Sequence, residues 1–433
     1  MAWDFSTEPE FERELAWMRS FVDDEIMPLE ALAPPDEARF RAIVAPLQEQ
    51  VRARGLWAAH LSPELGGQGF GQVKLALMHE ILGRTVYAPT VFGNQAPDSG
   101  NAELIALAGT PAQKDRWLYP LLAGSLRSAF AMTEPEVSGS DPTLIATAAR
   151  RDGEEWILTG HKWFTSNGSV ADFIIAMAWT DEGVAEPAFS MFIVPAGTPG
   201  VRIVRDIGTM EAPAGALSGF RAGGFGHAEI YFDNVRLTAA NLLGDAGQGF
   251  RLAQQRLGPG RLHHCMRWVG LAQRALDMLC ERAVSRSVHG SLLAQQGMIQ
   301  SWIADSAAEL QAARLMTLHA AWRMDNVGAP AARTEISMIK YYGAQVLTAI
   351  IDRALQVHGA LGYSTDMPLE AMYREARAAR IYDGPDEVHR IVVARRTLAR
   401  YQAHEVPSEY VPARRAFAEQ KFAAVLAALP SGS

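Results

Sequence analysis

The sequence has little of what marks several familiar protein classes. It has only two cysteines, Cys265 and Cys280, in 433 residues, which argues against a disulfide framework or a cysteine-based metal site. No apolar run approaches ~18 residues, so no membrane-spanning helix is expected. The acidic N-terminus lacks the charged-then-apolar pattern of a secretion signal. We therefore expect a cytoplasmic protein whose two cysteines pack as small apolar residues within helices.

Common nucleotide-binding and catalytic motifs are absent as well. The chain has no G-x-G-x-x-G after a strand, no G-x-x-x-x-G-K-[ST], no H-E-x-x-H and no G-x-S-x-G. Its formal charge of −8 argues against a nucleic-acid partner. The histidines are scattered, and the adjacent pair His263–His264 cannot share a helix face, so no metal site is expected. Any redox cofactor would have to bind through another arrangement.

What the chain does contain changes in pattern twice along its length. Helical spacing of apolar residues and Pro/Gly breaks dominate up to about residue 125, short β-branched and aromatic runs follow to about 240, and long helical stripes then continue to about 400. Strands and helices therefore occupy separate regions, which indicates an α+β fold of more than one domain. We expect a helical domain at 1–127, a β-domain at 128–244, a helical bundle at 245–403 and a tail at 404–433.

Individual patterns support this division. Phe11, Leu15 and Met18 fall at helical spacing near the start of the chain. In the β-region, alternation of apolar and polar residues over 228–233 predicts a half-buried strand. Five glycines and a proline within 212–226 predict a long loop. Two C-terminal stripes predict helices: Leu262, Cys265, Val269, Ala272, Leu276 and Leu279; and Ile336, Ile339, Gly343, Val346, Ile350 and Ala354.

Two segments of the β-region carry groups that suit a flat heterocycle or a phosphate. Residues 130–141 (FAMTEPEVSGSD) offer several hydroxyls and turn N–H groups, although a polar connecting loop explains them equally. Residues 160–168 (GHKWFTSNG) place an aromatic pair beside Thr165, although a strand end with core aromatics is an alternative. Neither segment alone identifies a ligand.

Two segments of the C-terminal region carry charge. Gly258-Pro-Gly260 predicts a turn that would place Arg261 in the first turn of a helix, unless Arg261 is a surface residue. Asp383 follows an apolar pair, Ile381–Tyr382. Apolar surroundings disfavour a carboxylate, so its pKa should rise toward working pH, as suits a general base. The alternative is that Asp383 or Asp386 caps a helix that begins near Pro385.

The order and spacing of these segments resemble those of the acyl-CoA dehydrogenase family. The resemblance runs from about residue 10 to 400 and rests on FAMTEP…GSD, KWFTSNG, GLAQRAL, RSVHG, QVHGALGYSTDMPLE and IYDGPDEVHR. It implies an N-terminal helical domain, a central β-domain and a C-terminal four-helix domain, in agreement with the pattern of the chain.

The resemblance also implies ligands. It implies FAD as the cofactor, in contact with Phe130, Met132, Thr133, Ser138, Gly139, Ser140, Trp163, Phe164, Thr165, Arg286, Gln356, Gly359, Ala360, Pro385, Asp386 and Glu387. It implies an acyl-CoA substrate in contact with Ser140, Gly258, Arg261, Tyr382 and Gly384. In the family, the residues that match Arg286 and Gln356 reach the FAD of a neighbouring subunit, so a homodimer or homotetramer is expected. An electron-transfer flavoprotein is the expected electron acceptor.

By the same resemblance, Asp383 is the catalytic base, although most members carry Glu at this position. Another branch places its Glu at the position of Gly260, so no relocated Glu is present. The combination of Asp with GPDEVH is closest to a subgroup whose animal members are fused to a kinase-like domain and include 4-hydroxyacyl-CoA users. These 433 residues have no room for that domain. The flavin loop TEPEVSGSD is one residue longer than the commoner TEPxxGSD.

The expected reaction is α,β-dehydrogenation of an acyl-CoA to the trans-2-enoyl-CoA, in which Asp383 takes the α-proton and FAD takes the β-hydride. An acyl-CoA oxidase or a flavin monooxygenase on the same scaffold is one alternative. A flavin-binding or assembly protein without catalysis is another. Asp is one methylene shorter than Glu, a deficit of about 1.5 Å. Because a 1 Å misplacement can cost on the order of 100-fold in rate, the pocket must differ to compensate.

Overall fold

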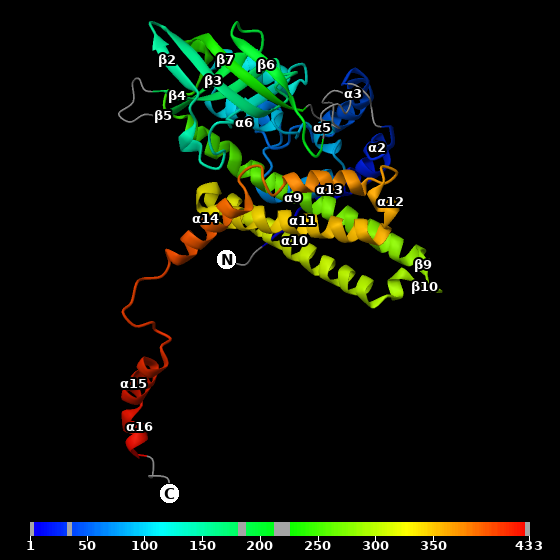
Figure 1. Cartoon of the computed structure of the whole chain (residues 1–433), viewed down its shortest axis with the longest axis vertical. Helices are drawn as coiled ribbons and strands as arrows, with labels where there is room; N and C mark the ends of the chain where they lie inside the picture. Colours follow the sequence, from blue (N-terminus) through cyan, green and yellow to red (C-terminus); the bar gives the residue numbers. More distant parts are fainter. Residues whose placement is uncertain (1–3, 33–36, 181–187, 212–225, 429–433) are drawn as a thin grey trace. The chain divides into compact units, whose positions relative to one another are not determined.

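The computed structural model describes residues 4–32, 37–180, 188–211 and 226–428 (Figure 1). Helices come first, and apolar residues at helical spacing bury one side of them. Phe11, Leu15, Met18 and Phe21 of the first helix are all buried, as their spacing predicted. The helices are α1 (Pro9–Phe21), α2 (Leu29–Leu32), α3 (Glu37–Ala53), α4 (Gln72–Leu82), α5 (Ala88–Val91), α6 (Asp98–Ala108), α7 (Pro111–Gln113) and α8 (Tyr119–Leu122).

A mixed sheet follows, in the order β6-β7-β3-β2-β4-β5-β8, with β1 pairing parallel to β4. Its strands are β1 (Ser128–Ala131), β2 (Ala148–Asp152), β3 (Glu155–Ser166), β4 (Phe173–Thr180), β5 (Ala188–Pro195), β6 (Val201–Ile207), β7 (His227–Thr238) and β8 (Leu242–Leu243). Ala228, Ile230 and Phe232 of β7 are fully buried, which confirms the predicted alternation.

Strand β4 lies at the centre of the β-domain and is buried on both faces. Phe173, Ile175 and Met177 pack into one apolar cluster with α6, whereas Ile174 and Ala176 pack into a second cluster with β3 and β7. Successive side chains of a strand point to opposite faces, so one strand can join both clusters. This packing fixes β1 and the loop after it against the rest of the sheet.

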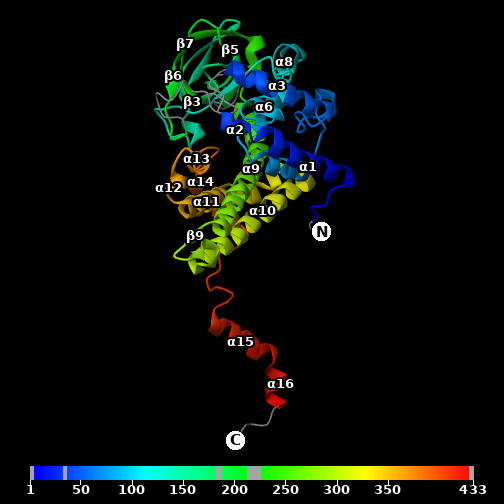
Figure 2. The same ribbon diagram turned by 90° about the vertical axis from the view of Figure 1, so that its right-hand side faces the viewer.

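Long helices complete the first unit, and α9, α10 and α11 run side by side in both views (Figures 1 and 2). Every residue of the two apolar helix stripes predicted for this region is buried, including Gly343. The elements are α9 (Gly249–Ser285), β9 (Ser287–Val288), β10 (Ser291–Leu292), α10 (Gly297–Ala331), α11 (Arg333–His358), α12 (Ala360–Tyr363), α13 (Leu369–Ala378) and α14 (Asp386–Leu398). The predicted α+β class, with helices on either side of a β-domain along the chain, is confirmed.

Residues 391–433 form a second unit, whose described part holds the end of α14, α15 (Val411–Lys421) and α16 (Ala423–Ala428). The described part of the tail is therefore partly helical. Most of the predicted loop 212–226 lies outside the described residues. Both cysteines are free thiols, and Cys265 is buried within α9. Among the helices that the structure describes, none combines the length and apolar character needed to cross a bilayer.

Candidate functional site

Asp383 lies in a short turn before α14, and its main chain is held by two side chains from other parts of the fold. Nε of Arg261 donates to the Asp383 carbonyl at 2.9 Å, and Nε2 of His389 lies 3.1 Å from the same oxygen. The φ angle of Asp383 is +54°, in the left-handed region that side chains other than glycine seldom adopt. Such a conformation persists where surrounding contacts determine it, and it is frequent at functional sites.

The next residue is fixed just as tightly. Gly384 has a φ of +100°, and a Cβ there would stand 2.8 Å from Nε2 of His389. The Gly384 carbonyl accepts a 3.1 Å bond from Nζ of Lys340, which also donates to the Ala379 carbonyl at 2.8 Å. Lys340 is completely buried in α11. Helices α9, α11 and α14 thus each contribute one basic side chain that holds a carbonyl of this turn.

The carboxylate of Asp383 faces basic side chains, of which Arg261, Arg256 and Lys340 are cations. Its Oδ2 lies 3.7 Å from Nε2 of His264, and its side chain is 22% exposed. Burial alone would raise its pKa, but His264, Arg261, Arg256 and Lys340 outweigh burial, so the pKa lies below its ordinary value. The expected upward shift is therefore wrong. The apolar neighbours in sequence matter less than basic residues supplied by α9 and α11.

Neither aspartate caps α14 in the manner considered from the sequence. The helix begins at Asp386, three residues beyond Asp383. Asp386 is buried, and its Oδ2 accepts from Nε of Arg380 at 2.8 Å and from Nε2 of Gln345 at 3.1 Å. Both bonds are to Oδ2, whereas the buried Oδ1 has no partner among the described residues. The cofactor contact that the resemblance implied for Asp386 stays a prediction.

Arg261 does not lie in the first turn of a helix. Helix α9 continues from Gly249 through Pro259 to Ser285, so the predicted turn at Gly258-Pro-Gly260 is wrong. A proline inside a helix loses one backbone hydrogen bond and usually favours a break. Here the helix packs against α4, α10 and α11 along its length, and this tertiary packing overrides the local preference. Arg261 reaches Asp383 from within the helix.

The two segments predicted to hold the flavin lie side by side. Thr133 and Trp163 exchange main-chain contacts: Trp163 N donates to Thr133 O at 3.1 Å, and Thr133 Oγ1 donates to Trp163 O at 2.9 Å. Phe164 is 45% exposed, and the exposed Ser138 and Ser140 hydroxyls lie 2.8 Å apart. An open aromatic face beside exposed hydroxyls suits a flat ring and a phosphate.

A buried ion pair joins these segments. Nζ of Lys162 lies 2.8 Å from Oε1 of Glu134 and donates to the Met132 carbonyl at 2.8 Å. Glu134 also accepts from the backbone N–H groups of Ala146 and Thr147. A fully paired buried charge network of this kind fixes one arrangement of the loop against β3. The sequence alone did not indicate this pair.

Thr165 follows the aromatic pair Trp163–Phe164 and points into the β-domain. Its side chain is fully buried, and Oγ1 has no partner among the described residues. The register of β3 against β7 shifts between Lys162 and Thr165, which turns Thr165 inward with Lys162. Ser166 is only partly buried instead, with Oγ 2.9 Å from Nδ1 of His227. The buried Thr165 hydroxyl without a partner is compatible with the predicted cofactor contact, which stays a prediction, and the less buried Ser166 is a second candidate.

Four residues predicted for the cofactor lie away from the other segments. Arg286 is exposed where α9 ends, and Gln356 is exposed near the end of α11, followed by the exposed Gly359 and Ala360. Figures 1 and 2 show these ends of α9 and α11 beside β9 and α12, remote from the β-domain. Within one chain they do not join the segment at 130–140. Their predicted role requires a second copy of the chain.

The remaining predicted residues lie in three places: the Asp383 turn, helix α9, and strand β1 with the loop after it. The Tyr382 hydroxyl accepts a 2.9 Å bond from Nε1 of Trp268, so Tyr382 is oriented by α9. Phe130 and Met132 are at β1 and just after it, Gly139 lies between the two exposed serines, and Gly258 is buried within α9. Pro385 is half-buried and Glu387 is exposed.

Sequence reasoning missed four polar residues at this site. Three of them interact electrostatically with the Asp383 carboxylate: His264, Lys340 and Arg256. The fourth, Glu103 of α6, interacts with Arg256. The Arg256 guanidinium lies 4.2 Å from the ring centre of Phe130, so it links α9 to the flavin segment. One signal was available, because Arg256 and His264 lie within five residues of Arg261 in the sequence. Nothing in the sequence pointed to Lys340, which sits inside an apolar helix stripe.

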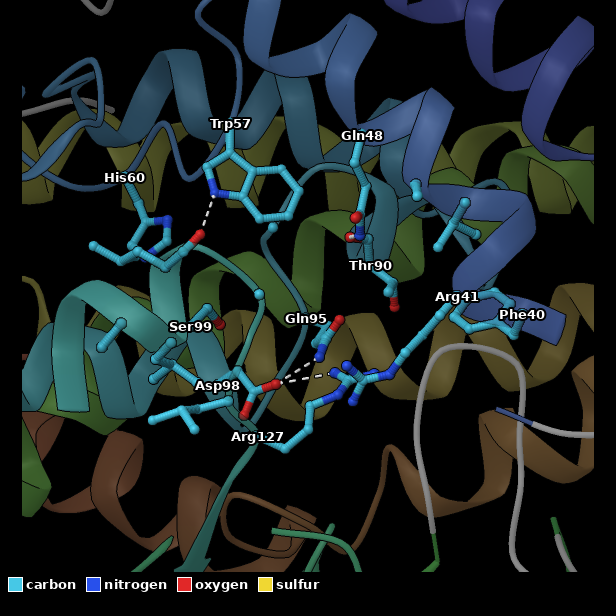
Figure 3. A pocket seen from close by; sticks show the side chains of 18 residues that line it. Phe40, Arg41, Gln48, Trp57, His60, Thr90, Gln95, Asp98, Ser99 and Arg127 are labelled. Atoms are coloured by element: carbon cyan, nitrogen blue, oxygen red, sulfur yellow. Dashed lines mark hydrogen bonds and ion pairs between the residues drawn. The ribbon is translucent and has the colours of Figure 1, made fainter. Parts of the chain in front are cut away.

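A separate pocket of about 230 Å³ lies in the N-terminal helical region (Figure 3). Trp57, His60 and Asp98 are among the residues that line it. Asp98 Oδ2 is already paired with Nη1 of Arg127 at 3.0 Å and accepts from Gln95 at 2.7 Å. None of the residues predicted for cofactor or substrate lines this pocket. The candidate site is therefore the region around Asp383 and the 130–140 segment.

Comparison with known proteins identifies the family. Models of the N-terminal, middle and C-terminal domains of acyl-CoA dehydrogenase match residues 9–125, 129–235 and 247–398. A Mycobacterium tuberculosis protein named as an acyl-CoA dehydrogenase, FadE2, is 42% identical over 86% of this chain and 88% of its own length. The chain belongs to the acyl-CoA dehydrogenase family. It is accordingly an FAD-dependent oxidoreductase, as the motifs predicted.

Two further relatives differ in how much of their own length this chain covers. Acyl-CoA dehydrogenase family member 11 of Rattus norvegicus is 42% identical over 82% of this chain, but the chain spans only 45% of that protein's length. A solved structure described as an acyl-CoA dehydrogenase from Mycobacterium abscessus is 41% identical, with a TM-score of 0.84 over 92% of this chain and 100% of that one. The exposed aromatic and hydroxyl groups beside Trp163 fit the FAD of this family.

Proposed function

We propose that the chain catalyses α,β-dehydrogenation of an acyl-CoA thioester to the trans-2-enoyl-CoA, with Asp383 as the general base. The observation that carries the proposal is the Asp383 turn: a carboxylate in a left-handed backbone conformation, with its carbonyl held by Arg261 and His389. Contacts from three helices hold the carbonyls of Asp383 and Gly384, so the position of the carboxylate is fixed. A base that must meet one C–H bond requires a fixed position.

The charges around Asp383 support this role. Because its pKa is lowered, the carboxylate is ionised and ready to accept a proton at neutral pH. A lower pKa also makes it a weaker base. The same cations offset that loss, since they would stabilise the negative charge that develops on the thioester as the α-proton leaves. Arg261, Arg256 and Lys340 therefore act on both partners of the proton transfer.

The other residues position the ligands. FAD, when bound, accepts the hydride from the β-carbon. Trp163, Phe164, Ser138 and Ser140 would hold it, with Thr165 and Ser166 as the candidate hydroxyls beside the aromatic pair. Ser140, Gly258, Arg261, Tyr382 and Gly384 would line the acyl-CoA path. Pro385 and Glu387 stay predictions for the cofactor side.

We also propose a homodimer or homotetramer in which Arg286, Gln356, Gly359 and Ala360 approach the FAD of a second copy. Their exposure at the far end of α9 and α11 supports this arrangement. An electron-transfer flavoprotein is the proposed electron acceptor, and the cytoplasm the proposed compartment.

Anaerobic titration of the FAD-loaded protein with a panel of acyl-CoA thioesters tests the reaction. We expect at least one thioester to bleach the visible flavin absorbance, with formation of the 2-enoyl product. Re-oxidation by an electron-transfer flavoprotein, with little oxygen consumption, would then distinguish a dehydrogenase from an oxidase or monooxygenase. A protein that cannot be loaded with FAD, or that no thioester bleaches, would contradict the proposal.

A further inference from the structure

His264 lies between Asp383 and an arginine of its own helix. Nε2 of His264 is 3.7 Å from Oδ2 of Asp383, and Nδ1 is 3.2 Å from Nη2 of Arg267. His264 and Arg267 are three residues apart on α9, so their side chains lie on one face of the helix. The imidazole therefore bridges the proposed base and a buried guanidinium.

The arginine fixes the tautomer of the imidazole. A guanidinium only donates hydrogen bonds, so Nδ1 of His264 must be the acceptor in its contact with Arg267. Burial, with Arg267 next in importance, lowers the pKa of His264 to about 3, so the ring is neutral at working pH. A neutral imidazole with Nδ1 unprotonated carries its hydrogen on Nε2. That hydrogen is on the nitrogen nearest Asp383.

Both ends of the bridge are held in place. Nη1 of Arg267 donates to the Asn94 carbonyl at 3.1 Å, which anchors the guanidinium to the N-terminal helical region. The His264 ring lies 5.2 Å from the Tyr382 ring and 6.4 Å from that of Trp268, centre to centre. Packing between aromatic rings restricts rotation of the imidazole. A restrained ring can impose an orientation on its neighbour.

We propose that His264 is a positioning residue for Asp383: Arg267 keeps the His264 proton on Nε2, and that N–H orients the Asp383 carboxylate for removal of the α-proton. The inference rests on the proposed function. It would explain how Asp383 can serve where most members of the family carry the longer Glu, because a shorter acid needs a more exact placement. The present 3.7 Å separation exceeds a hydrogen bond, and catalytic hydrogen bonds often shorten only when substrate is bound.

The pH dependence of this role involves every charged group around the carboxylate. The groups that interact electrostatically with Asp383 are Arg256, Arg261, His264, Cys265 and Arg267 of α9, Tyr382 of the turn itself, Lys340 of α11 and His389 of α14. The N–H of His264 favours the charged carboxylate over the neutral acid. Its removal should therefore raise the pKa of Asp383, and the acid limb of the kcat profile should move to higher pH.

The test compares His264→Ala and His264→Gln with His263→Ala, each as FAD-loaded full-length protein. His263 is the adjacent residue, but its Nε2 lies 3.0 Å from Gln72 and its ring stacks on His79, away from Asp383. We expect His264→Ala to lower kcat about 10- to 100-fold with a small change in KM, and to shift the acid limb upward. His264→Gln, which retains an N–H donor, should recover part of both effects. A His264→Ala enzyme with the kcat and pH profile of His263→Ala would overturn the proposal.

If His264→Ala fails to bind FAD, Arg267→Lys decides the matter. Lysine keeps the positive charge but lacks the planar guanidinium, whose two separate nitrogens contact Asn94 and His264. An upward shift of the acid limb supports the proposal, and a wild-type profile overturns it. Asp383→Asn separates the two hypotheses. If substrate still bleaches the flavin of Asp383→Asn, Asp383 is not the base. If Asp383→Asn is inactive while His264→Ala behaves like wild type, only the positioning role of His264 is contradicted.

Discussion

Nε of Arg261 donates a 2.9 Å hydrogen bond to the backbone carbonyl of Asp383, although 122 residues separate them along the chain. This bond joins helix α9 to the turn before α14. From the sequence, only the family resemblance indicated that these two segments lie close together. The turn it fixes has an unusual backbone. The first predictions therefore concern the residues that hold that backbone.

Gly384→Ala should lower both stability and activity. Alanine at a φ of +100° is strained, and its Cβ would also stand 2.8 Å from Nε2 of His389. We expect a loss of about 1–3 kcal/mol in the free energy of unfolding from the backbone conformation, with more from the clash. Gly153→Ala is the matched control, since Gly153 also has a positive φ but a Cβ there would meet no atom within 4 Å. Denaturant unfolding of both variants measures the difference, and equal losses would contradict a role for the contact with His389.

Lys340→Met should destabilise the protein by leaving two carbonyls without their donor. The Nζ of Lys340 bonds the carbonyls of Ala379 and Gly384, and each unsatisfied buried acceptor costs about 1–3 kcal/mol. The loss of a nearby cation should also raise the pKa of Asp383. Lys74→Met is the control, because Lys74 pairs with Glu8 at the surface, where a pair contributes about 1 kcal/mol or less. Thermal unfolding measures the loss of stability, and the acid limb of the kcat–pH profile measures the shift in pKa. Equal losses of stability in Lys340→Met and Lys74→Met would contradict the prediction.

Ser166→Ala should weaken FAD binding more than Thr165→Val. Ser166 is partly exposed beside the aromatic pair, whereas the Thr165 hydroxyl is buried without a partner among the described residues. Loss of one hydrogen bond of about 0.5–1.5 kcal/mol corresponds to roughly a 2- to 10-fold increase in Kd. Fluorescence titration of the apoprotein with FAD measures this. Weaker binding by Thr165→Val than by Ser166→Ala would contradict this order and favour Thr165, the residue predicted from the sequence.

Glu103→Gln should change the pH dependence of stability. Burial raises the pKa of Glu103 to about 7, despite the opposing charge of Arg256. Because this pKa is raised on folding, the glutamate contributes stability below its unfolded pKa and loses it as pH rises through 7. Glutamine resembles the protonated form, so the variant should gain about 1–3 kcal/mol relative to wild type between pH 5 and pH 8. Denaturant unfolding at both pH values measures it, with the exposed Glu154→Gln as control. A gain no larger than that of the control would contradict the raised pKa.

The helical and strand regions could be predicted because burial there follows a simple period. Leu262, Cys265 and Val269 lie at helical spacing, and Ala228 and Ile230 alternate with polar residues, so the buried face can be read directly from the sequence. The same reading failed at Pro259. Local preference favours a turn there, but packing of α9 along three other helices keeps the helix continuous.

The chemistry of the site was harder to predict, because it depends on residues distant in sequence. Tyr382 and Ile381 suggested an apolar setting for Asp383, whereas the structure brings Arg256 and Lys340 toward it from two helices. Similarly, Thr165 is aligned with the aromatic pair in sequence, but a shift in strand register turns its side chain inward. No local pattern encodes either effect.

The central claim is that Asp383 removes the α-proton, and one measurement tests it most directly. Asp383→Asn, loaded with FAD, is mixed anaerobically with an acyl-CoA that bleaches the wild-type flavin, and the rate of bleaching is recorded. Asp366→Asn, an exposed aspartate in the same region, serves as control. We predict that Asp383→Asn binds FAD normally but bleaches at least ~10²–10⁴-fold more slowly, while the control matches wild type. Bleaching of Asp383→Asn at the wild-type rate would contradict the account.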